Sequence, residues 1–362
     1  MKSIREPAEF SAHEHATAAS RSVSASSIGV VFAVLAFAYP IVLILCVRSW
    51  GRFSPVEGMA AIAFAVLLGL FAYWARQKHA TRSRFRARFA SNRAAVWGLA
   101  VLLALTAMVV LAPVISGDPD DMGAGVRYSA PGVAHVLGTD RFGRDVWARV
   151  AHGGQTTLTL CIVSVGLSVL IGVWVGALAG MAGRRVDDVL MRLVDGMLAF
   201  PRILLLLTVA AFASPGALML GVTLALTGWM GIARIVRGEI RRLREREFAE
   251  AAIASGVGKM GLVWRHLLPN TIGAVIVAAT LNAGAVILLE SSLSFLGLGV
   301  QPPTPSWGAM VFEGRDALRT AWWVSAAPAI AITMAAASFN LVGDGLRDAF
   351  DARTTTAAPG QR

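Results

Sequence analysis

The stretch HGGQTTLTLCIVSVGLSVLIGVWVGALAGMAG, residues 152–183, decides the fold class, because it holds no acidic or basic side chain apart from its histidine. An α-helix rises about 1.5 Å per residue, so roughly 20 apolar residues cross the ~30 Å hydrocarbon core of a bilayer. We therefore predict a membrane-spanning helix over residues 156–183.

The composition of the whole chain agrees with a membrane protein. Of its 362 residues, 56% are hydrophobic and 15% are charged, and the mean hydropathy is +0.63. Soluble domains carry about 25% charged residues, so this chain has too few charges to solvate a globular surface of its size. Cys46 and Cys161 lie in apolar runs, which argues against a disulfide and against metal ligation by cysteine.

Seven further segments are predicted to cross the membrane. Residues 203–233 are uncharged but too long for one helix and too short for two, and a Ser-Pro-Gly turn at 214–216 divides them. The first half must therefore begin upstream and carry Arg192, Asp195 and Arg202 in its early turns. Arg192 and Asp195, three residues apart on one face, are expected to form an ion pair. The eight predicted spans are residues 28–47, 58–75, 94–115, 156–183, 189–213, 217–235, 271–299 and 321–343.

The distribution of charge predicts the orientation of these spans. The net charge is +11, and residues 76–93 hold seven basic side chains and no acidic one. Residues 234–265 hold eight basic and four acidic side chains, whereas 116–150 hold four and five, and 301–320 hold two of each. Because cytoplasmic loops collect Lys and Arg, both termini are expected in the cytoplasm. We interpret residues 76–93 as a topology anchor in contact with anionic lipid, not as a nucleic-acid site.

The longest cytoplasmic loop contains a segment that does not belong in lipid. Good helix formers over 243–255 and from Lys259 onward predict two short helices. Gly256 would end the first in the left-handed conformation or permit close backbone approach, and Pro269 would end the second. An apolar stripe on the second helix could face the bilayer surface, the membrane helices of the chain or another protein. The stripe consists of Met260, Val263, Trp264 and Leu267.

This loop resembles the EAA loop of binding-protein-dependent ABC importer permeases. The resemblance lies in Glu250-Ala251-Ala252, in Gly256 four residues later, and in His266-x-Leu268-Pro269. The usual family pattern has isoleucine in place of His266, but histidine there is compatible with the dipeptide and oligopeptide branch. Other motifs resemble the C-type permeases of that branch. They are LGTDRFGRD (137–145), LMRLVD (190–195), LSFLGLG (293–299), QPPTPSWG (301–308) and FNLVGDGLRD (339–348).

The resemblance, which covers roughly residues 86–353, implies an all-α polytopic membrane protein. Its core would be a six-helix, type I ABC importer permease over residues 94–350. The flanking parts would be a cytoplasmic tail (1–27), an accessory helix pair (28–75), a basic cytoplasmic loop (76–93) and a second tail (351–362).

In such permeases the EAA loop forms a coupling helix that sits in a groove of a cytoplasmic ATPase subunit. The residues that match this role here are Glu250, Ala251, Ala252, Gly256, His266, Leu268 and Pro269. The chain has no Gly-x-x-x-x-Gly-Lys-Ser/Thr loop. We therefore expect no catalytic residue and no cofactor on this chain, with ATP and Mg²⁺ held by separate ATPase subunits. No His, Cys and acidic residues stand at metal-ligand spacing, so no metal site is expected.

The expected partners are a second, different permease subunit, two ATPase subunits, an extracytoplasmic binding protein and membrane lipid, without nucleic acid. The predicted location is the bacterial inner membrane. The implied substrates are di- or oligopeptides, and permeases of this type also serve nickel, glutathione and oligosaccharides. A stand-alone ion-coupled carrier or a membrane enzyme is the competing class. It would need a cluster of intramembrane acids or histidines.

Two groups of ionisable residues lie outside the coupling loop. Glu290 stands deep in the seventh predicted span, where it could line the translocation path or hydrogen-bond to a neighbouring helix. Asp140, Arg144 and Asp145, with Arg141, precede the fourth span. They could face the binding protein, or they could fix an interfacial helix by pairing with one another.

Overall fold

The computed structural model describes residues 79–123, 125–212 and 216–351. The predicted accessory helix pair (28–75) and both tails, apart from Asp351, lie outside the described residues. Within the described part, regular structure is helical except for one isolated bridge between Thr139 and Asp145. The all-α prediction is confirmed.

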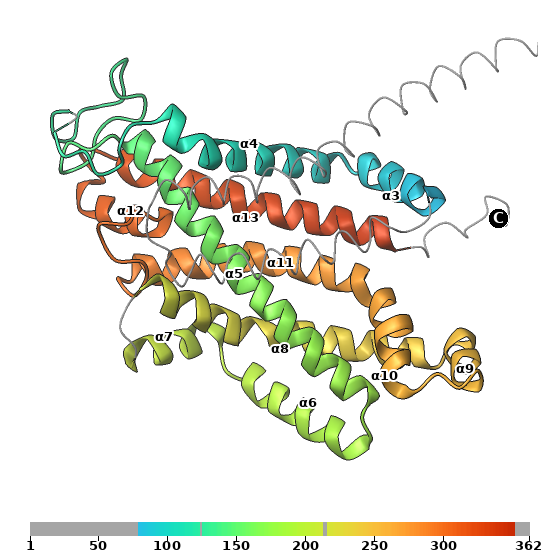
Figure 1. Ribbon diagram of the computed structural model, residues 1–362. Coiled ribbons are helices and arrows are strands. Elements are labelled where there is room, and N and C mark those ends of the chain that lie inside the picture. The colour runs from blue at the N-terminus through green and yellow to red at the C-terminus, as the bar shows by residue number, and fades with distance from the viewer. Residues whose placement is uncertain (1–78, 124, 213–215, 352–362) are drawn as a thin grey trace, which may run out of the picture.

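The bundle has two chemically different ends. Figure 1 shows long helices lying side by side, with the 116–145 loop and α12 at one end and α9 and α10 at the other. In chain order the helices are α3 (His79–Ser91), α4 (Arg93–Ile115), α5 (Val146–Met181), α6 (Arg184–Leu198), α7 (Arg202–Phe212), α8 (Ala217–Arg244), α9 (Glu247–Ala254), α10 (Lys259–Leu262), α11 (Leu268–Phe295), α12 (Trp307–Gly314) and α13 (Trp323–Phe350).

The described residues contain five helices long and apolar enough to cross a membrane, or six if the bent pair α6–α7 is one span. That pair corrects the prediction of one helix over 189–213, because its two halves meet at 84°. The chain leaves the helical conformation at residues 199–201. Proline disfavours the α conformation of the residue before it, so Pro201 accounts for a break at Phe200. With six charged side chains among 15 residues, α6 is amphipathic, and α7 is apolar.

Several helices run further than the apolar segments predicted. Helix α8 continues from residue 235 to Arg244, α13 continues from 343 to Phe350, and α5 begins at Val146 instead of 156. The basic segment 76–93, predicted as a loop, contains the helix α3. Hydropathy marks where a helix leaves lipid, not where its hydrogen-bond ladder ends, which explains these differences.

Glycines line the most extensive helix–helix contact among the described residues, between α5 and α8. A Cβ atom on Gly176 would lie 2.5 Å from the carbonyl oxygen of Ala233, and one on Gly180 would lie 2.8 Å from Ile240. Small residues four apart on one helix face let two backbones approach closely, which favours association within lipid. The two helices that flank the candidate sites are thereby fixed to each other.

A small second core joins α3 to the α9 end of the bundle. Phe89 is fully buried and Phe85 nearly so, and both pack with Leu346 near the end of α13. The rings of Phe85 and Phe350 lie 4.8 Å apart. This contact explains why α13 remains helical beyond its apolar segment.

Candidate functional site

The predicted coupling loop contains a short helix, α9, between the ends of α8 and α10. The predicted helix over 243–255 is split, because α8 ends at Arg244 and α9 begins at Glu247. Gly256 ends α9 with φ of +81°, as predicted. Its N–H donates to the carbonyl of Ile253, and the N–H of Val257 donates to that of Ala252. These two bonds form a Schellman motif, which fixes the direction in which the chain leaves the helix.

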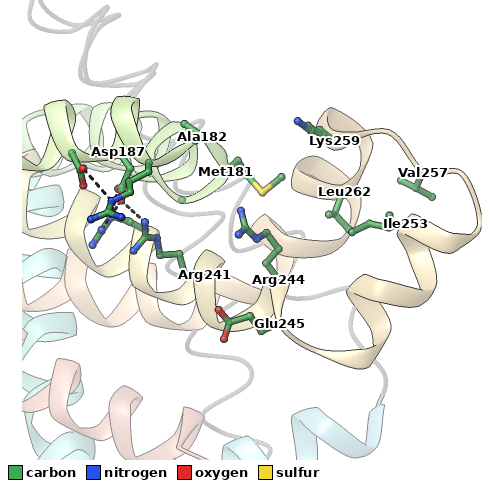
Figure 2. A pocket seen from close by; sticks show the side chains of 15 residues that line it. Met181, Ala182, Asp187, Arg241, Arg244, Glu245, Ile253, Val257, Lys259 and Leu262 are labelled. Atoms are coloured by element: carbon green, nitrogen blue, oxygen red, sulfur yellow. Dashed lines mark hydrogen bonds and ion pairs between the residues drawn. The ribbon is translucent and has the colours of Figure 1, made fainter.

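The residues of α9 divide between a buried and an exposed face. Ala252 packs inward beside Ala249, which is completely buried. Glu250 and Ala251 lie on the exposed side. Phe248 and Ile253 are 39% and 53% exposed, and the sequence analysis did not single them out. Phe248 lies one turn before Ala252 and Ile253 directly follows it, so the two side chains flank the buried face, with Ile253 lining a pocket beside the loop (Figure 2).

The second helix of the loop is predicted to stop before Pro269, but the chain remains helical through this residue. A π-helical turn over Val263–Leu267 joins α10 to α11, and Pro269 lies in the first turn of α11. The helical conformation is continuous from α10 through the π turn into α11, so the N–H that Pro269 lacks falls directly after the π turn. His266 and Pro269 are half-buried, and Leu268 is buried.

The predicted apolar stripe divides into two faces because of this π turn. Val263 and Leu267 are buried, whereas Met260 is 68% and Trp264 is 48% exposed. The Trp264 ring packs edge-on against Trp174 of α5, with ring centroids 5.5 Å apart. The stripe therefore contacts the chain's own helices from both faces, through Val263 and Leu267 in the core and through Trp264 against α5.

An ion cluster joins α6 to α8 near the coupling loop. The buried carboxylate of Asp187 accepts hydrogen bonds from Arg237 and Arg241. The hydrogen bond from Arg237 is the main reason that the pKa of Asp187 lies below its usual value. The predicted pair of Arg192 and Asp195 is wrong, because Asp195 instead pairs with Arg234 of α8 at 2.5 Å.

A pocket of about 770 Å³ lies between this cluster and the coupling loop. In Figure 2, Asp187 and Arg241 lie on one side of it, Lys259 and Leu262 on the other, and Arg244 below. The pocket separates α9 and α10 from α6, so the loop is attached to the bundle mainly through α8 and α11.

The acidic and basic residues at the α12 end form a buried network. Asp140 accepts hydrogen bonds from Arg144 at 2.7 Å and from Arg149 at 3.0 Å, and both arginines also bind Glu313 of α12. Asp140 is 2% and Arg144 is 4% exposed. Asp145 caps α5 by accepting from the N–H of Trp147. Of the two roles considered for these residues, this geometry favours mutual pairing.

Glu290 is buried inside the bundle. Its carboxylate accepts hydrogen bonds from Ser294 at 2.9 Å and from Ser291 at 3.3 Å, both on its own helix, α11. The side chain is 1% exposed, so in this conformation it lines no open path. Within the described ranges, no group of three or more His, Cys, Asp or Glu side chains is placed to hold a metal ion.

Comparisons with known proteins identify the family. Residues 172–356 match the model of the binding-protein-dependent transport system inner membrane component, and residues 81–131 match the N-terminal TM domain of oligopeptide transport permease C.

Three comparisons with individual proteins illustrate the likeness. A protein of Brucella suis named as a peptide transport system permease is 40% identical over 257 residues, or 71% of this chain and 86% of that protein. The oligopeptide transport system permease protein OppC of Escherichia coli is 40% identical over 269 residues, or 74% and 89%. A solved structure of the MetNI methionine ABC transporter matches with a TM-score of 0.47 and 21% identity over 56% of this chain and 96% of that one.

The family match covers all the membrane helices from the second half of α5 onward, together with the coupling loop. The similarity to the Brucella suis and Escherichia coli proteins covers 86% and 89% of their own sequences. The chain belongs to the family of inner membrane components of binding-protein-dependent transport systems.

Proposed function

We propose that this chain is one permease subunit of an ATP-driven importer for di- or oligopeptides. It pairs with a second, different permease subunit, receives peptide from an extracytoplasmic binding protein, and is driven by two cytoplasmic ATPase subunits. Both termini and the α9 end of the bundle face the cytoplasm of a bacterial cell. The printed names of the relatives support the peptide substrate. The basic excess of residues 76–93 and 234–265 supports the orientation.

The observation that carries the proposal is the construction of the coupling loop. A short helix with exposed Phe248 and Ile253 projects from the bundle, and its buried face holds Ala249 and Ala252. An ATPase groove that binds the exposed face would displace α9 as a unit. The displacement would pass to α8 and α11, because α9 and the following π turn connect these two helices.

ATP-driven closure of the ATPases would then move the permease helices between outward-open and inward-open states, in the manner of alternating access. Glu250, in the first turn of α9, would stabilise the positive end of this helix. His266, Leu268 and Pro269 would hold the start of α11 to the loop.

The first experiment substitutes Gly256→Asp. A side chain at a φ of +81° is strained, so the Schellman terminus should be lost and α9 should no longer hold its direction. The expected result is normal membrane insertion with peptide uptake reduced roughly tenfold or more, since about 1.4 kcal/mol corresponds to a factor of ten. Uptake and ATP hydrolysis are measured together in vesicles that contain the complete importer.

Gly258→Asp is the matched control. Gly258 has an ordinary φ of −66°, and an added Cβ there meets no atom within 4 Å. This variant should transport normally. Normal uptake by Gly256→Asp would exclude the coupling role, and uptake by the chain without any ATPase subunit would favour the stand-alone carrier.

A further inference from the structure

A single guanidinium lies at mid-depth in the bundle. Arg202 opens α7 directly after the 84° bend. Its Nε donates to Thr227 Oγ1 of α8 at 3.2 Å, one terminal nitrogen donates to Asn282 Oδ1 of α11 at 3.2 Å, and the other donates to the carbonyl oxygen of Leu224 at 3.1 Å. Asn282 stands at the centre of α11 (Leu268–Phe295), which places the guanidinium near the middle of the membrane.

The charge of Arg202 is not matched by a carboxylate. All three of its described hydrogen-bond partners are neutral. Arg202 is half-buried, whereas Arg144 and Arg149, the buried arginines of the described residues, each bind Asp140 and Glu313. A charged side chain at membrane depth is costly and usually marks a substrate or ion pathway. Arg202 therefore differs from the structural ion pairs of this protein.

Unused hydrogen-bond donors converge beside it. A guanidinium has five N–H groups, and the three described bonds leave one on each terminal nitrogen. Asn282 Nδ2 is buried and has no hydrogen-bond partner. A Cβ atom on Gly228 would lie 2.4 Å from Ser168 Oγ, 3.0 Å from Arg202 Nη2 and 3.2 Å from Asn282 Nδ2, so these three polar groups lie close together beside α8.

We propose that Arg202 and Asn282 form a carboxylate-binding site in the translocation path, which takes the C-terminal carboxylate of a peptide in transit. The two free guanidinium N–H groups supply charge-assisted hydrogen bonds to a carboxylate. The orphan amide of Asn282 supplies a third donor. The bound carboxylate neutralises Arg202 at the depth where either charge alone is most costly. This inference rests on the proposed function as a peptide permease.

A purely structural role for Arg202 is the competing explanation, because the side chain also ties α7 to α8 and α11. Two variants separate the roles. Arg202→Gln removes the charge. Asn282→Asp keeps Arg202 in place but puts a carboxylate of the protein beside it, so the site is filled permanently while the link between the helices is kept or strengthened.

The test measures initial uptake by the complete importer, with saturating binding protein, of one peptide as the free acid and as the C-terminal amide. Both variants are expected to take up the free acid about tenfold more slowly than the wild type, because a charge-assisted contact is lost. Uptake of the C-terminal amide should be as fast in both variants as in the wild type. Assembly with the ATPase subunits and the Tm of the purified complex confirm the fold.

Normal free-acid uptake by either variant would overturn the proposal, and so would equal fold losses for acid and amide. A loss in Arg202→Gln alone, with normal uptake by Asn282→Asp, would assign Arg202 to the structural role. A wild-type importer that carries no peptide would instead contradict the proposed function, so the two failures are distinguishable.

Discussion

At the scale of single residues, the Asp140 carboxylate is the centre of the network at the α12 end. It accepts from both Arg144 and Arg149, and all three side chains are almost completely buried. Removing one partner of a buried ion pair leaves the other charge without compensation. The network therefore fixes the start of α5 against α12 through Glu313, and it depends on every member.

The Asp140→Ala substitution tests this arrangement. It should lower the free energy of unfolding by about 3–5 kcal/mol, the usual cost of breaking a buried pair, and the Tm of the purified protein in detergent measures the loss. Arg141→Ala is the control, because Arg141 is exposed and its guanidinium contacts only the Phe142 ring among the interactions described. Equal Tm values for the two variants would contradict the structural role of Asp140.

Residue identity alone could not have revealed this network. Arg149 and Glu313 are 164 positions apart in the chain, so nothing in the local pattern of either predicts the pair. Similarly, Arg202 was visible as a charge in a predicted span, but its partners Thr227 and Asn282 lie on two later helices. The pairing of Arg192 with Asp195 was inferred from spacing, and a tertiary partner, Arg234, took its place.

At the scale of elements, the uncharged runs and turn residues indicated the regions in which the long helices of the described core lie. Helix boundaries were less predictable, because α8 and α13 are stabilised beyond the lipid by contacts with other elements, such as Phe89 of α3. The bend between α6 and α7 has a local signal in Pro201, but its angle depends on packing against α8. The Gly256 terminus was predictable because the left-handed conformation has a residue preference.

The contact between α5 and α8 permits a test with matched glycine substitutions. Gly176→Ala should destabilise the protein by about 1–3 kcal/mol, as for other overpacked positions, because its Cβ would lie 2.5 Å from a rigid backbone oxygen of α8. Gly231→Ala, within α8, meets no atom within 4 Å and should be neutral or stabilising by up to about 1 kcal/mol, since alanine favours helices. Thermal unfolding of both proteins measures the difference, and equal changes would show that the helices do not approach as described.

At the scale of the whole molecule, the two ends of the bundle differ in how their charges are used. At the α12 end, buried arginines are matched by carboxylates, and the 116–145 loop packs over them. At the α9 end, arginines of α8 lie around a pocket beside the coupling loop, Ile253 of α9 lines that pocket, and Phe248 and Met260 are exposed. This difference is the one expected if one end stays rigid while the other transmits movement.

Ile253 of α9, exposed at the pocket beside the coupling loop, gives the last prediction. Ile253→Glu should weaken binding of the ATPase subunits at least tenfold, because a charge would enter an apolar contact. The Tm of the isolated permease should change little, since Ile253 is 53% exposed. Val133→Glu makes the same kind of change at the opposite end, where Val133 is fully exposed, and should leave ATPase binding intact. Co-purification and a binding titration with the ATPase subunits measure both variants. Undiminished binding by Ile253→Glu, or equal losses in the two variants, would place the ATPase contact elsewhere on the molecule.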